Sequence, residues 1–119
     1  MIIRAALVLL CCLLISIPVA QADSIKERYA KLPPPSLTTQ KSTLYLEKCI
    51  GIGISEWMTP IVVRGEHEVL IAGYPNLPAN AVYMLVKIQD TGSSRTIAIN
   101  AHKGWDDKTV ALIRSCMER

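Results

Sequence analysis

Six side chains able to act as acids, bases or metal ligands stand in two short stretches of this sequence: Glu66, His67, Glu68, His102, Asp106 and Asp107. An imidazole beside a carboxylate can serve as a general base or hold a metal ion. The spacing matches no recognised ligand set, and acidic residues at a turn or a helix start are commonly solvated or capping groups. We therefore expect no metal, no cofactor and no catalytic residue in this chain.

Two further stretches contain fragments of catalytic or phosphate-binding patterns. The segment around Ser55 begins like a nucleophile elbow, but Trp57 takes the place of the second glycine, and the chain is too short for the fold that carries this motif. Gly51 and Gly53 are followed neither by a third glycine nor by the Lys-Ser/Thr ending of a phosphate loop. Both stretches are therefore interpreted as structural.

The first 22 residues have the pattern of an export signal. Arg4 precedes an apolar run over residues 5–17, and Ala20-Gln21-Ala22 offers the small residues that a signal peptidase requires. The run is shorter than the roughly 20 residues that span a bilayer. We expect a mature chain that begins at Asp23, is periplasmic or secreted, and touches the membrane only through its signal.

The number and positions of the cysteines agree with export. Cys11 and Cys12 lie within the apolar run and leave with it, so Cys49 and Cys116 are the pair that remains. Exported chains reach an oxidising compartment, where two such thiols commonly form a disulfide. No Cys-x-x-Cys spacing suggests a redox-active pair. The sequence therefore predicts a structural bridge.

Composition limits the class of protein. The mature chain has the length of one small domain, and its Lys and Arg only slightly outnumber its Asp and Glu, which excludes a dedicated nucleic-acid surface. Three consecutive prolines, 33–35, favour an extended segment. We expect a flexible proline-rich leader over residues 23–40 and a single domain over 41–119.

Apolar residues at three- and four-residue spacing predict a helix from Ser42 to about Glu56 and another that begins at Asp106. Asp106 is expected as the N-cap, with Trp105 packed on Val110 as a hydrophobic staple. The buried face of the first helix is expected to comprise Leu46, Cys49, Ile50, Gly53 and Trp57, and that of the second Thr109, Leu112, Ile113, Cys116 and Met117.

Between the helices the pattern is typical of strands. Pro60 opens an edge strand over 61–63, and further strands are expected over 69–72, 82–89 and 95–100, with a loop over 73–80. Short turns favour an antiparallel meander. The predicted fold class is α+β: a helix, a four-stranded and mainly antiparallel sheet, and a C-terminal helix, with both helices on one face.

The uncovered face then suggests a function. Tyr83, Leu85 and Lys87 are expected there, with Tyr74 from the adjacent loop. Large side chains on an open sheet face suit a protein contact, so we predict a binding or adaptor domain that recognises another exported protein or itself. The alternative is a small exported hydrolase that acts on envelope material through His102, Asp106 or Glu66.

Overall fold

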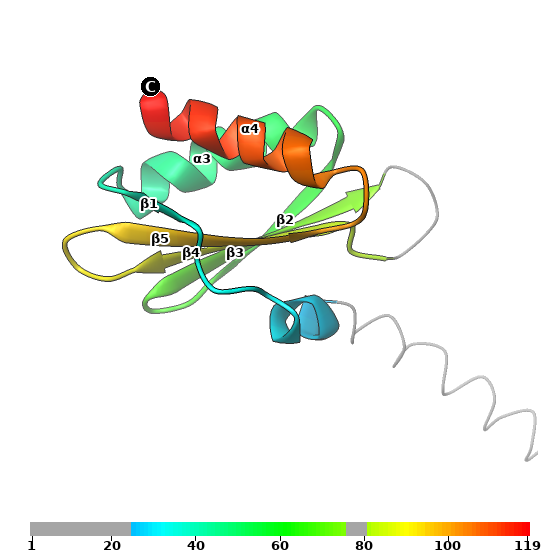
Figure 1. Ribbon diagram of the computed structural model, residues 1–119, viewed down its shortest axis with the longest axis horizontal. Helices are drawn as coiled ribbons and strands as arrows, with labels where there is room; N and C mark the ends of the chain where they lie inside the picture. The colour runs from blue at the N-terminus through cyan, green and yellow to red at the C-terminus, as the bar shows by residue number, and fades with distance from the viewer. Residues whose placement is uncertain (1–24, 76–80) are drawn as a thin grey trace, which may run out of the picture.

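The computed structural model describes residues 25–75 and 81–119, so the predicted signal lies outside the described residues. Figure 1 shows two helices lying across one face of an antiparallel sheet. The elements follow in the order β1 (Leu37–Thr39), α3 (Thr43–Ser55), β2 (Met58–Arg64), β3 (Glu68–Pro75), β4 (Met84–Asp90), β5 (Arg95–Ala101) and α4 (Asp106–Glu118). The α+β class is as predicted, and the sheet has five strands rather than four. No helix among the described residues is long and apolar enough to cross a membrane.

The additional strand comes from the segment expected to be a flexible leader. β1 is antiparallel to β5, with Leu37 opposite Ile97, and the Ser36 N–H donates to the Ile97 carbonyl at 3.2 Å. The strand order is therefore β1-β5-β4-β3-β2, with β1 and β2 at the two edges. A strand of three residues is too short to show an alternation of apolar and polar side chains. β1 forms because it pairs with β5, so it could not be predicted from its own sequence.

The main core lies between the sheet and the two long helices. Alternate residues of the strands point toward α3 and α4, as period-two alternation requires. The fully buried members are Leu46, Ile50, Ile54, Ile71, Met84, Val86, Ile88, Ile97, Ile113 and Cys116. At Gly53 the helices approach so closely that a β-carbon would overlap the Leu112 side chain. The prediction that both helices cover one face is confirmed.

The helix starts agree with the sequence to within one residue. Ser42 caps α3, its hydroxyl accepting from the Tyr45 N–H at 3.1 Å. Trp105, not Asp106, occupies the N-cap position of α4, and Asp106 lies in the first turn with Asp107. Carboxylates there still interact favourably with the helix dipole, which is why Asp106 resembled a cap in the sequence.

The opposite face of the sheet is partly covered as well. Residues 25–30 form a short helical turn, drawn in blue below the sheet in Figure 1. Ile25 and Leu32 pack on a second small core of Ala72, Val82 and Leu85. We call residues 25–32 the N-terminal cover. They were expected to be part of a flexible leader, but they contact the sheet.

Polar contacts also attach the N-terminal cover to the sheet. Arg28 donates from Nε to the Val82 carbonyl at 3.0 Å and from a terminal nitrogen to Asn100 Oδ1 at 2.8 Å. Asn100 Nδ2 in turn donates to the Lys31 carbonyl at 3.3 Å. These bonds join residues about 50 to 70 positions apart in the chain, so no local sequence pattern could predict them.

Candidate binding surface

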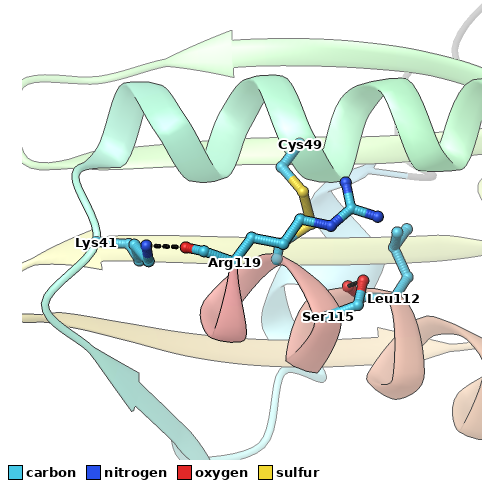
Figure 2. The surroundings of a disulfide bond; sticks show 6 residues. Lys41, Cys49, Leu112, Ser115 and Arg119 are labelled. Carbon is cyan, nitrogen blue, oxygen red and sulfur yellow. Dashed lines mark hydrogen bonds between the residues drawn. A yellow bond between two sulfur atoms is a disulfide. The ribbon is translucent and has the colours of Figure 1, made fainter.

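The predicted disulfide is confirmed. Cys49 of α3 and Cys116 of α4 are bonded, with their Cα atoms 5.8 Å apart (Figure 2). Cys116 is fully buried and Cys49 partly so. Figure 2 also shows Lys41 donating to the main-chain oxygen of Arg119 beside the bridge. The chain is therefore a small disulfide-stabilised domain whose bridge joins the two helices of one layer.

The candidate catalytic side chains are not brought together. Glu66 and His67 lie in the turn between β2 and β3, where the His67 carbonyl accepts from the Asp90 N–H at 2.8 Å. His102 follows β5, whose last residue Ala101 pairs with the opposite end of β4. The length of β4, about 20 Å at the usual rise per residue, separates the two groups. The structure therefore does not bring Glu66 together with His102, two of the residues named for the alternative hydrolase.

Metal ligands are likewise dispersed. Within residues 25–75 and 81–119, no three side chains of His, Cys, Asp or Glu are grouped so that they could hold an ion. His102 instead stacks on Tyr83, with ring centroids 4.9 Å apart, and its Nδ1 lies 3.2 Å from the Lys103 carbonyl oxygen. This histidine is an exposed partner of an aromatic ring.

The four predicted contact residues differ in their surroundings. Leu85 is fully buried beneath the N-terminal cover, so the expectation that it is exposed is wrong. Tyr83 precedes β4 and packs against the main core rather than lying on the uncovered face. Lys87 lies on the predicted face, but its Nζ is 3.6 Å from Glu68 Oε2 and 5.1 Å from the centre of the Tyr29 ring.

Tyr74 belongs to β3 rather than to a loop, and it packs beside the second core. Burial raises the pKa of its phenol above the usual 10.0 because desolvation disfavours the charged form. Below pH 10 the Tyr74 phenol is protonated in both the folded and the unfolded protein. Above pH 10 the phenol loses its proton more readily in the unfolded protein than in the folded one.

We therefore expect the stability of the wild type to fall as the pH rises through 10 and beyond, and Tyr74→Phe to lose part of that dependence. Thermal unfolding between pH 8 and pH 11 measures it (roughly the range over which a tyrosine titrates). Tyr45→Phe, at a more exposed site on α3, is the matched control. Identical pH profiles for wild type and Tyr74→Phe would contradict this assignment.

Two tryptophans and a lysine form a cluster at the start of α4. The Trp57 and Trp105 rings lie 6.3 Å apart, and Lys108 Nζ lies 4.7 Å from the centre of the first and 5.3 Å from that of the second. Both rings also pack on the main core. The cluster therefore closes one end of the helical layer, and the amine is held by the ring faces.

Trp105→Ala should lower the free energy of unfolding by about 2 kcal/mol, less than a fully buried tryptophan would lose, because the ring is only partly buried. Urea denaturation followed by circular dichroism measures the change. Lys108→Ala, which removes the cation but keeps both rings, is the control and should cost well under half as much. A change below about 0.5 kcal/mol for Trp105→Ala would show that the ring contributes no packing.

The largest exposed apolar side chains of the sheet belong to β2. Ile61 is 44% exposed and Val63 is 46% exposed, and both point to the face opposite α3 and α4, since Val62 between them packs on the main core. In the sheet they stand beside Ala72 and Leu70 of β3. The N-terminal cover buries Ala72 but leaves these two β2 residues accessible.

Within residues 25–75 and 81–119, no strand pairs with the outer side of β2. The Gly65 N–H donates to the Glu68 carbonyl at 2.8 Å, so in this antiparallel register the odd-numbered residues of β2 pair with β3. The N–H and C=O groups of Val62 and Arg64, and the carbonyl of Pro60, therefore point away from β3. Pro60 has no N–H to lose, which is why proline is tolerated on this side.

We call Ile61, Val63 and the outward backbone of Pro60, Val62 and Arg64 the β2 edge surface. The Arg64 side chain lies on the helix side of the sheet, where its guanidinium bonds the buried carboxylate of Glu47. Pro60 and the apolar run were the sequence signals for this surface, but they indicated an edge strand without showing which side chains remain uncovered. Comparison of the chain with protein-family models, curated proteins and solved structures found no match.

Proposed function

We propose that this chain is an exported domain that acts by protein–protein binding, to another exported protein or to a second copy of itself, and that the β2 edge surface is its contact. The observation that carries the proposal is the combination of exposed Ile61 and Val63 with backbone groups that point out of the sheet. An extended segment of a partner can add to such an edge through main-chain hydrogen bonds, while neighbouring side chains supply apolar contact and selectivity.

Export is supported by two separate features. The signal pattern over residues 1–22 directs the chain out of the cytoplasm. The bridge between Cys49 and Cys116 suits an oxidising compartment, because reducing conditions inside most cells oppose such bonds. The proposed site of action is therefore the periplasm or the exterior.

The choice of β2 rests on a contrast between the two edges of the sheet. β1 is only three residues long, whereas β2 has seven residues and carries two half-exposed apolar side chains on one face. Natural proteins commonly protect long edges with charges that point into solvent. β2 has Pro60 and the 67% exposed side chain of Arg64, which also bonds Glu47, on either side of three apolar residues, 61–63, so the stretch between them carries no charge.

Capture from an envelope extract tests the proposal. Ile61→Lys combined with Val63→Lys should reduce the amount of bound partner at least tenfold, since each change places a charge in an apolar contact (about 1.4 kcal/mol of lost binding suffices). Ile52→Lys is the matched control, because Ile52 is 69% exposed on α3, and it should bind as the wild type does. Undiminished capture by the double lysine variant, with its fold intact, would refute the proposal.

A further inference from the structure

We infer that the partner at the β2 edge surface is a second copy of this chain, whose β2 pairs antiparallel with the first about a two-fold axis at Val62. The inference rests on the proposed function, because it assumes that this surface is a protein contact. A two-fold contact uses the same surface of both molecules and closes on itself. Each copy contributes β2, the one long edge that the strands of the described residues leave unpaired, so association stops at a dimer with a continuous sheet of both copies' strands.

The backbone supports this pairing. Val62 presents its N–H and C=O outward, so the two Val62 residues can exchange two hydrogen bonds at the axis. On either side, the outward Arg64 N–H can donate to the Pro60 carbonyl of the second copy. Because Pro60 has no N–H, the Arg64 carbonyl of the second copy receives no hydrogen bond from it. This carbonyl lies at the end of the paired segment, where water can donate to it. Pro60 therefore weakens the contact between the two β2 strands but does not prevent their pairing.

The side chains select one register among the symmetric ones. With the axis at Val62, each exposed Ile61 lies opposite the exposed Val63 of the second copy. Shifting the axis to Ile61 would place Val63 opposite Thr59, and shifting it to Val63 would place Ile61 opposite Gly65. Directly opposed side chains on one sheet face are the pairs that stabilise strand pairing. Only the Val62 register gives both apolar residues an apolar partner.

Charge also favours the Val62 register. Each Arg64 lies opposite Pro60 of the second copy, on the helix side of the sheet, while its guanidinium stays bonded to Glu47 of its own chain. An axis at Arg64 would bring two arginines together, and like charges directly opposed are destabilising. With two apolar pairs and few hydrogen bonds, the contact lies at the small end of specific interfaces. We expect a weak dimer in equilibrium with monomer.

Sedimentation equilibrium over a wide range of concentrations tests the inference on oxidised protein recovered from the secreting cell. The wild type should shift from monomer to dimer as concentration rises. Hydrogen exchange at the Val62 and Arg64 amides should slow over the same range. Ile61→Lys with Val63→Lys should weaken self-association at least tenfold, while Ile52→Lys should leave it unchanged.

A charge-swapped pair tests the register itself. Ile61→Lys combined with Val63→Glu should recover dimerisation at low salt, because the Val62 axis places each new amine opposite a new carboxylate of the second copy. Far-UV circular dichroism confirms that each variant is folded. Recovery that disappears at high salt would identify the ion pairs as its cause.

The failures are distinguishable. A wild type that stays monomeric at every concentration, or a charge-swapped variant that associates no better than the double lysine variant, overturns the two-fold pairing. If the monomeric wild type still captures a different protein and the double lysine variant does not, the proposed function stands and the partner is another chain. If neither capture nor self-association depends on Ile61 and Val63, both proposals fail.

Discussion

Replacing Cys49 and Cys116 together by alanine should lower the free energy of unfolding by about 4 kcal/mol, within the usual range of about 2 to 5 kcal/mol for a native bridge. The bridge joins residues 67 positions apart, so its loss frees a long loop in the unfolded chain. Urea denaturation of oxidised wild type and of the double variant measures the difference. For a domain of this size, such a loss is a large part of the total stability.

Wild-type protein reduced with dithiothreitol is the matched control. It keeps both sulfur atoms but lacks the bond, so its stability should lie close to that of the double alanine variant. Alkylation followed by mass spectrometry should find no free thiol at Cys49 or Cys116 in the oxidised protein. Two free thiols in folded, oxidised wild type would contradict the bridge itself.

Leu85→Ala should cost about 3 kcal/mol, on the scale of large-to-small changes in a core. Leu85 is fully buried, and the groups around it include Ile25 and Leu32 of the N-terminal cover. Chemical denaturation measures the loss. Ile61→Ala is the control, since Ile61 is also a strand residue but is about half exposed, and it should cost less than about 1 kcal/mol.

A double-mutant cycle shows whether the N-terminal cover causes this burial. Leu32→Ala and Leu85→Ala should not be additive, because the two side chains belong to one cluster. Additive losses would mean that the residues act independently. A change below about 0.5 kcal/mol for Leu85→Ala would instead restore the sequence-based expectation that Leu85 is exposed.

The features that sequence analysis predicted are those with a local cause. The spacing of Leu46 and Ile50, and of Ile113 and Cys116, follows the helical repeat, so each helix and its buried face could be identified. Once both cysteines lay on buried helix faces, their pairing followed as well. The N-cap of α4 was misplaced by one residue because Trp105 occupies that position without any side-chain cap hydrogen bond, so no capping side chain marks it in the sequence.

The features that were missed depend on contacts between distant parts of the chain. The alternation of β4 correctly placed Leu85 away from α3 and α4, but Ile25 and Leu32, which cover it, come from a segment whose prolines suggested a spacer. β1 was missed for the same reason. The β2 edge surface could be located only in part, because Pro60 indicates an edge while the extent of the N-terminal cover decides which residues of that face stay accessible.

The disulfide divides the chain into a covalent ring, residues 49–116, a long tail that precedes it and three residues that follow it. β2 to β5 lie within the ring, whereas β1 and the N-terminal cover belong to the tail. A single peptide-bond cleavage inside the ring would leave both fragments attached until the bridge is reduced. A single cleavage in the tail just before α3 would leave β1 and the N-terminal cover attached only by non-covalent contacts. Their dissociation would make β5 an open edge and expose Leu85 to solvent.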